Sequence, residues 1–360
     1  MKLFRKRYFN FLLLFLVCAF ALSVYFYKDF YKVLLDRAQG YYWIWQGDKH
    51  YKNREIHKAI VSYKYGIRLH PTHYRAKYNL ANIYVMYEDY LSATEEYVKA
   101  LEINPYYQVA RINYAIVLAN ALLDYDKAIE EYSKAVEKKP KKWSYIPFII
   151  DNKSTFKHNT GVAYYNLGIA WRKKSLLASQ SPREVRACLE NSAEAYNKAL
   201  EIKKDYETYY NLALVEHLLG NYISAGENYC KAIEIAPLNY QAHYNLALML
   251  RTVKKYTESY DEFRKAGLIM DANGDGDKTK YIYDMLNNTM VKIVAKNDYN
   301  YLVQHIQEES DALTSEVTYV NGVLVVSDEL DKAMIENFRK CALKEYHQNK
   351  KKEKKEKNKR

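Results

Sequence analysis

The feature that most constrains this fold is a sequence pattern that recurs every 34 residues. Asn-Leu-Ala at 211–213 returns at 245–247. In the surrounding stretch 209–237, apolar side chains recur with a helical period in two runs, separated by Gly220-Asn221 and ended by Pro237. The stretch predicts two short amphipathic helices, neither of which can bury its apolar stripe alone. Stacked copies are therefore needed to form a core.

Six such units follow one another along the chain, at 40–73, 74–107, 108–142, 161–205, 206–239 and 240–273. The second is the most regular, and its small, aromatic and turn-forming residues are Leu80, Ala81, Tyr84, Ala93, Tyr97, Ala100 and Pro105. Small residues let helices approach closely, and aromatic rings fill the space between them. The pattern resembles the tetratricopeptide repeat (TPR) family. This resemblance implies an all-α, right-handed superhelix of helix-turn-helix repeats.

The array departs from a regular repeat at three places. The third unit has one extra residue in its turn, which displaces Ala128. Residues 143–160 then interrupt the array, and in the fourth unit residues around 175–185 are inserted between the two helices. We therefore expect two blocks of three repeats, 40–142 and 161–273.

The region after the repeats, 274–346, is expected to contain a capping helix within 279–310, a β-hairpin at 316–326 and a helix at about 328–346. A cap is needed because an open array exposes the apolar face of its last repeat. Asn321-Gly322 suits the type I′ turn of a two-residue hairpin loop. The tail at 347–360 is rich in lysine and is predicted to be disordered.

The N-terminus has the pattern of a membrane anchor. Residues 1–7 are basic, and the uncharged run 8–27 is long enough for a helix to cross a bilayer, with aromatic residues at both ends. The positive-inside rule then keeps the N-terminus cytoplasmic and puts the repeats on the periplasmic or exoplasmic side, after a stem at 28–39. Two alternatives stay open: a cleaved signal peptide, with a site at Ala19-Phe20-Ala21, and a lipid attached at Cys18.

The charge distribution argues against a nucleic-acid partner. Of the net charge of +12, residues 1–7 contribute four and residues 347–360 contribute six. The body between them is nearly neutral and lacks the phosphate-neutralising surface that nucleic-acid binding requires. The four cysteines, at 18, 188, 230 and 341, are far apart, so the sequence predicts neither a disulfide framework nor a zinc site.

No pattern of catalytic residues stands out, and the protein is expected not to be an enzyme. No cofactor is predicted, although calcium is one interpretation of the acidic stretch after the sixth repeat. Its oxygen ligands would be Asp271, Asn273, Asp275 and Asp277. The twelfth loop position is Ile282, so the bidentate carboxylate is missing. We therefore favour a polar helix terminator at this place.

A row of asparagines gives the clearest functional signal. Five successive TPR-like units carry asparagine at their sixth position, which in TPR arrays faces the concave groove: Asn79, Asn113, Asn166, Asn211 and Asn245. Four of them follow a tyrosine directly, namely Tyr78, Tyr165, Tyr210 and Tyr244. An amide carries a donor and an acceptor, so such a row can bind the main chain of an extended peptide. Alternatively, these asparagines only help to pack the repeats.

The interruption contains a second candidate surface. Trp143, Tyr145, Phe148 and Ile149 make it too apolar for an ordinary solvated loop. It either folds back to cover the gap between repeats three and four, or forms a docking patch for another protein.

Together these features predict a single-pass, membrane-anchored scaffold that binds partner proteins through its concave groove and supports assembly of an envelope complex. By analogy alone, a periplasmic structure around the flagellar motor is one such complex. The alternatives are a TPR receptor for extended peptides on an organelle surface, a soluble secreted TPR protein, and an enzyme whose repeats recruit its substrate.

Overall fold

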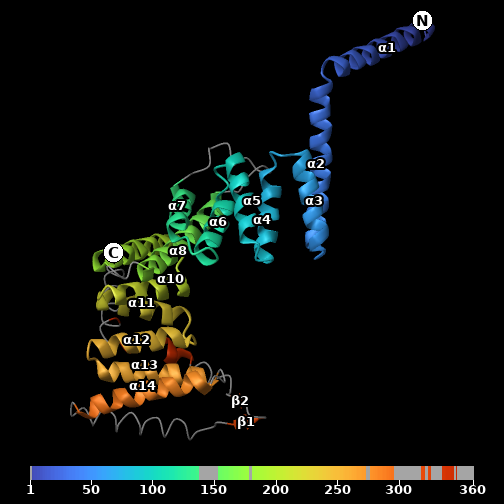
Figure 1. Ribbon diagram of the computed structural model, residues 1–360. Helices are drawn as coiled ribbons and strands as arrows, with labels where there is room; N and C mark the ends of the chain where they lie inside the picture. The colour runs from blue at the N-terminus through green and yellow to red at the C-terminus, as the bar shows by residue number, and fades with distance from the viewer. Residues whose placement is uncertain are drawn as a thin grey trace, which may run out of the picture. The chain divides into compact units, whose positions relative to one another are not determined.

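A computed structural model describes residues 2–137, 153–177, 181–272, 276–295, 318–320, 323–325, 335–343 and 346. The chain divides into two compact units, Met1–Lys141 and Lys142–Arg360, and each is considered by itself (Figure 1). In both units the described elements are almost entirely α-helices, and consecutive helices pack as pairs.

The first unit contains α1 (Lys2–Phe26), α2 (Lys28–Lys52), α3 (Ile56–Leu69), α4 (Tyr74–Met86), α5 (Tyr90–Ile103), α6 (Gln108–Asn120) and α7 (Tyr125–Glu137). The pairs α2–α3, α4–α5 and α6–α7 correspond to the first three predicted repeats. The predicted stem at 28–39 is not a separate element, because α2 is continuous from Lys28 into the first repeat.

The second unit contains α8 (Lys153–Leu177), α9 (Pro182–Ile202), α10 (Tyr206–Leu218), α11 (Tyr222–Ile235), α12 (Tyr240–Thr252), α13 (Tyr256–Ala272) and α14 (Gly276–Ala295). Here α8–α9, α10–α11 and α12–α13 form the pairs, and α14 packs against α13. The residues inserted in the fourth repeat mostly lengthen its helices, because α8 continues to Leu177 and α9 begins at Pro182.

One aromatic ring fills the centre of each helix pair. These six rings are at most 1 % exposed: Tyr63, Tyr97, Tyr132, Tyr196, Tyr229 and Phe263. In the first and fourth repeats the ring lies against a glycine, and a Cβ added to Gly168 would come within 2.7 Å of the Tyr196 ring. The small residue and the aromatic residue of the repeat pattern are therefore direct packing partners.

The turns inside the repeats share one backbone conformation. A residue with positive φ follows the first helix in five pairs, two or three residues beyond its last helical residue: Arg54, Glu88, Leu123, Gly220 and Lys254. The amide of the following residue bonds a carbonyl oxygen near the end of that helix, as in Asp89 N to Tyr84 O at 3.0 Å. The extra residue of the third repeat lies in this turn, as predicted, yet Ala128 stays fully buried.

The segment after α14 differs most from the prediction. Strands β1 (Thr318–Val320) and β2 (Val323–Val325) pair antiparallel with Thr318 opposite Val325, as a hairpin at 316–326 requires. However, the prediction of a helix at about 328–346 is wrong for its last part, because residues 335–339 are helical but 340–343 are not. We call residues 335–346 the C-terminal strap, of which 335–343 and 346 are described.

The strap is joined to the repeats by a disulfide between Cys230 of α11 and Cys341. The spacing of the cysteines, which predicts no disulfide framework, did not indicate this single pairing. The two cysteines are 111 residues apart in sequence, and only the tertiary structure brings them together. The helix ends before Cys341 because the Lys340 carbonyl and the Ala342 amide bond to side chains of α13 instead of continuing the helical hydrogen-bond pattern.

Helix α1 projects from the repeats (Figure 1). Its described apolar side chains are exposed, as at Leu14, Phe15 and Phe20. Among the described residues, no helix taken singly has both the length and the apolar character of a membrane span. Leu13–Ser23 and Lys28–Lys52 meet that criterion only as a pair, with an 89° bend between them.

Candidate peptide-binding groove

The five asparagines of the row lie at equivalent places on the first helix of their pairs, on α4, α6, α8, α10 and α12. All five are half-buried, as are Tyr78, Tyr165, Tyr210 and Tyr244. None of the five asparagines is fully buried, so each residue keeps part of its surface exposed. The structure therefore leaves a surface on which the predicted row can act.

The asparagines and tyrosines of successive repeats are bonded to one another. Asn245 Nδ2 donates to Tyr210 OH at 2.9 Å, and Asn211 Nδ2 donates to Tyr165 OH at 3.2 Å. In the first unit, Asn113 Nδ2 donates to Tyr78 OH, also at 3.2 Å. Each tyrosine is thus held by the asparagine of the next repeat rather than by its own neighbour in sequence. We call these Asn–Tyr pairs the amide–tyrosine ladder.

The two remaining asparagines have other partners. Asn79 Nδ2 donates to Asp48 Oδ1 at 3.2 Å and, at 3.4 Å, to Tyr63 OH. Asn166 Nδ2 donates to the Val162 carbonyl oxygen at 2.9 Å, one turn earlier in α8. The ladder is therefore most regular at the end of the second unit, on α10 and α12.

The hydrogen bonds define what the ladder can offer to a ligand. In Asn211 and Asn245, Nδ2 donates to two acceptors within the protein, so both N–H groups are used and the donor half of these two amides is not available to a ligand. No hydrogen bond to Oδ1 of Asn211 or Asn245 occurs within the described residues. The hydroxyls of Tyr165 and Tyr210 each accept a bond from an asparagine and keep their own proton to donate. The ladder thus presents an acceptor and a donor in each step.

A hollow of about 430 Å³ lies at the end of this ladder. It is lined by Tyr210, Tyr240, Gln241, Tyr244, Asn245, Tyr281 and Ile282. Three of these residues belong to the predicted row. Tyr240 and Gln241 were missed, although Tyr240 precedes Tyr244 by one helical turn and so shares its face. Tyr281 comes from α14, which the sequence identified only as a cap. We call this hollow the groove.

A smaller hollow of about 250 Å³ lies one step along the second unit. Its lining includes Tyr165, with Asp205, Glu207 and Thr208 from the start of α10 and Lys203 just before it. Two recesses thus occur along the ladder in this unit, as binding of a segment longer than a few residues would require.

The tyrosine hydroxyls remain neutral donors. Burial raises the pKa of Tyr165 and of Tyr210 above the usual value. The pKa of Tyr244 is also raised, first by burial and then by its contact with Tyr281. These groups therefore donate hydrogen bonds throughout the neutral range.

The two other predicted sites fall wholly or partly outside the described residues. Trp143, Tyr145, Phe148 and Ile149 lie outside the described residues, as do Asn273 and Asp275. Asp271 lies in α13 and Asp277 in α14. Residues 276–282 are helical, whereas a calcium loop starting at Asp271 would need them as loop. Within the described part of the chain, no three His, Cys, Asp or Glu residues are grouped to hold a metal ion.

Comparison with known proteins agrees with the fold. Residues 206–237, which form α10 and α11, match the tetratricopeptide repeat family. No curated protein matches the chain at a significant level. A solved structure of PilF from Pseudomonas aeruginosa covers 69 % of this chain and 98 % of its own, with 16 % identity and a TM-score of 0.50. The fold is therefore that of a TPR array.

Two further solved structures resemble the chain less well. One is PilW, described as a widely conserved type IV pilus biogenesis factor, with 16 % identity, 63 % of this chain and 91 % of its own covered, and a TM-score of 0.43. The other is residues 41 to the end of MamA from Desulfovibrio magneticus RS-1, with 18 % identity, coverages of 57 % and 94 %, and a TM-score of 0.41.

Proposed function

We propose that this protein is a non-enzymatic scaffold that binds extended segments of partner proteins along the amide–tyrosine ladder. One observation carries the proposal: Asn245 and Tyr210 are bonded to each other at the wall of the groove, and Asn245 Oδ1 accepts no hydrogen bond from the described residues. An extended peptide has an alternating series of N–H donors and C=O acceptors, which complements alternating hydroxyl donors and amide acceptors. Tyrosines add contact area at low entropic cost.

We further propose that the N-terminal helix anchors the scaffold in a membrane, with the repeats on the periplasmic or exoplasmic side. The exposed apolar side chains of α1 support an anchor, because such a surface is unfavourable in water. The Cys230–Cys341 disulfide supports the compartment, since disulfides persist mainly on the oxidising side of cellular membranes. Protease added to spheroplasts should therefore digest the repeats while sparing the first residues.

In this proposal the anchored array brings segments of envelope proteins together and so promotes assembly of a complex. A complex around the flagellar motor stays a prediction by analogy.

The groove is tested by peptide binding to the full-length protein in detergent. A displayed library of extended twelve-residue peptides would supply ligands, and their affinities would be compared between the wild type and the Tyr281→Ala variant. Tyr281 is 58 % exposed and lines the groove, so its removal should weaken binding about tenfold while leaving the fold intact.

The matched control is Tyr222→Ala. Tyr222 starts α11, is 36 % exposed and lies outside the groove lining. Equal affinity for both variants and the wild type would rule out the groove as the binding surface.

A further inference from the structure

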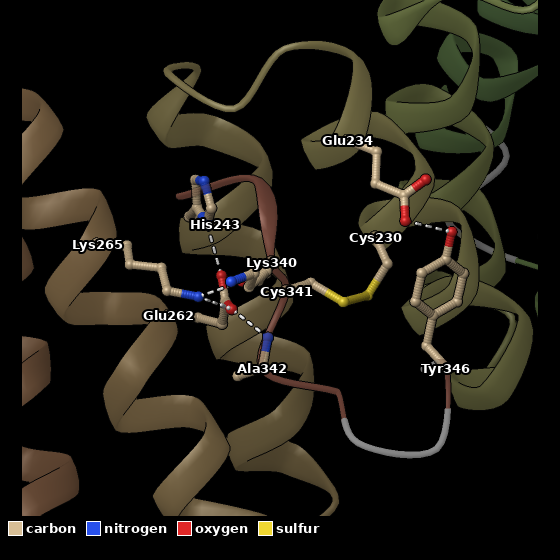
Figure 2. The surroundings of a disulfide bond; sticks show 9 residues. All are labelled: Cys230, Glu234, His243, Glu262, Lys265, Lys340, Cys341, Ala342 and Tyr346. Atoms are coloured by element: carbon tan, nitrogen blue, oxygen red, sulfur yellow. Dashed lines mark hydrogen bonds and ion pairs between the residues drawn. A yellow bond between two sulfur atoms is a disulfide. The ribbon is translucent and has the colours of Figure 1, made fainter. Parts of the chain in front are cut away.

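A second binding surface is centred on two buried charges of α13. Glu262 is fully buried and Lys265 is 7 % exposed. They are bonded to each other at 2.9 Å, and Glu262 Oε2 lies 2.5 Å from His243 Nδ1 of α12 (Figure 2). Buried charges are costly unless they are paired and fully hydrogen-bonded. The other hydrogen bonds of Glu262 and Lys265 therefore show what this cluster binds.

That capacity is used by the main chain of the C-terminal strap. Lys265 Nζ donates to the Lys340 carbonyl oxygen at 2.6 Å, and the Ala342 amide donates to Glu262 Oε1 at 2.5 Å (Figure 2). The two side chains thus bind one C=O and one N–H that are two residues apart. Such contacts recognise the backbone of a non-helical segment and are independent of its side chains.

Apolar and aromatic side chains of the strap supply the specificity. Phe338 and Leu343 are 5 % and 6 % exposed. Leu343 fills space that exists because residue 226 is glycine: a Cβ there would come within 2.9 Å of Leu343 Cδ2. Tyr346 OH donates to Glu234 Oε1 of α11 at 3.0 Å. The site therefore has a polar centre that forms hydrogen bonds with the main chain, and it has recesses that accept particular side chains.

The site lies on a different side of α12 from the groove. His243 faces the strap, whereas Tyr244 and Asn245 line the groove. Asn245 is two residues beyond His243, which places the two side chains roughly 200° apart around the helix. The two surfaces adjoin at Tyr240 and Gln241, which line both the groove and a hollow beside Ile335 and Arg339 of the strap. The strap's bonds to Glu262 and Lys265 lie outside the groove lining, so docking of the strap does not rest on the proposed function.

We propose that this face of α11–α13 is a docking site for an extended segment, and that its second occupant, besides the chain's own strap, is the strap of another copy. Among the described residues, the segment that complements the site is the strap, and a second copy carries the same segment. Residues 296–334 separate α14 from the strap, a length that lets it reach either site. The disulfide then fixes whichever strap is docked when it forms.

The covalent step is a thiol–disulfide exchange. A thiolate of Cys341 or Cys230 attacks oxidised glutathione, which releases one reduced glutathione and leaves a mixed disulfide. The other cysteine's thiolate then displaces the second glutathione and forms the Cys230–Cys341 bond. Two protein thiols are oxidised and one glutathione disulfide is reduced to two thiols.

Two full-length variants in detergent test exchange between copies, both with Cys18→Ser to remove the exposed thiol. The donor carries C230S and G226V, so its own site cannot accept its strap, while Cys341 remains. The acceptor carries C341S and L343D, so its strap cannot dock, while Cys230 remains. Mixed in a glutathione redox buffer, they should form a Cys230–Cys341 heterodimer, identified by non-reducing electrophoresis and by mass spectrometry of the linked peptides.

Adding G226V to the acceptor is the matched control, and it should lower the yield of heterodimer at least tenfold because Leu343 loses its space. Circular dichroism verifies that each variant is folded. The single variants C230S and C341S, which keep both recesses intact, should give the same linkage in lower yield. Absence of the linkage in both mixtures, or equal yield with the G226V acceptor, would show that the strap is an intrachain staple only.

Discussion

Glu262 links the C-terminal strap to α12 and α13 through one carboxylate. Burial by itself would raise its pKa, but the charges of Lys265 and His243 outweigh burial and lower the pKa from 4.5 to about 2. A carboxyl with a lowered folded-state pKa stabilises the fold fully above its unfolded value and loses this contribution as pH falls. The stabilisation should therefore disappear between pH 4.5 and about 2.

Glu262→Gln removes this titration. We expect the variant to have a lower free energy of unfolding than the wild type at neutral pH, and the difference should shrink as the pH falls below 4.5. Denaturant titrations at a series of pH values measure both quantities. A difference that stays constant down to pH 2 would show that the carboxylate is not held by these charges.

A substitution at Tyr210 tests a single hydrogen bond of the ladder. Tyr210→Phe removes the hydroxyl that accepts from Asn245 and should cost about 0.5–1.5 kcal/mol in free energy of unfolding. Tyr222→Phe serves as the control, because Tyr222 is part of no ladder pair. Chemical denaturation of the full-length protein gives both values, and equal losses would argue against the pairing.

Residue types predicted this ladder only in part. The asparagine row was visible because five repeats carry asparagine at the same position, 34 residues apart from Asn79 to Asn113 and from Asn211 to Asn245. The bond from Asn245 to Tyr210 was not, because it depends on how closely two repeats pack. The same holds for Tyr281, which reaches the groove from α14, and for Cys341, whose partner is 111 residues away. Such contacts depend on tertiary geometry that a periodic pattern does not encode.

At the scale of the helix pair, the two helices are connected by a turn that contains a residue with positive φ. Positive φ falls at Arg54, Glu88 and Lys254, all of which carry a Cβ, and at Gly220. A non-glycine residue in this conformation costs about 1–2 kcal/mol. Five turns nevertheless adopt it, because it lets the next amide bond back to the end of the first helix.

Glycine substitutions in these turns should therefore be stabilising. We expect Lys254→Gly to raise the free energy of unfolding by about 0.5–1 kcal/mol, since relief of the left-handed strain exceeds the added entropy of the unfolded chain. Gly220→Ala should lower it by about 1 kcal/mol, although no atom lies within 4 Å of the added Cβ. Denaturant midpoints compare the two. A loss of stability in Lys254→Gly, or a gain in Gly220→Ala, would refute this explanation of the turns.

Helix pairs were predictable because each carries its own small and aromatic residues. The elements that differ from the prediction lack such a pattern. The insertion of the fourth repeat was expected to separate its two helices, but it extends α8 and α9, whose added turns are compatible with helical propensity. The strap was expected to be helical to residue 346, but tertiary hydrogen bonds to Glu262 and Lys265 replace those of a helix.

At the scale of the whole molecule, three tasks are divided among parts of one chain. The repeats supply surfaces, the strap closes one of them, and the N-terminal helix is proposed to hold the assembly at a membrane. In our proposal, the ladder binds the main chain of an extended partner segment, and most side chains of that segment contribute little to the affinity.

The most direct test is a backbone scan of a peptide that binds the full-length protein. Single amide bonds would be replaced by esters, which removes one N–H donor while leaving side chains unchanged, and affinities would be measured by calorimetry. We predict losses of about tenfold at positions that face Asn211 and Asn245, and no loss at the intervening ones. Uniform tolerance of esters, with affinity set only by side chains, would contradict binding through the main chain.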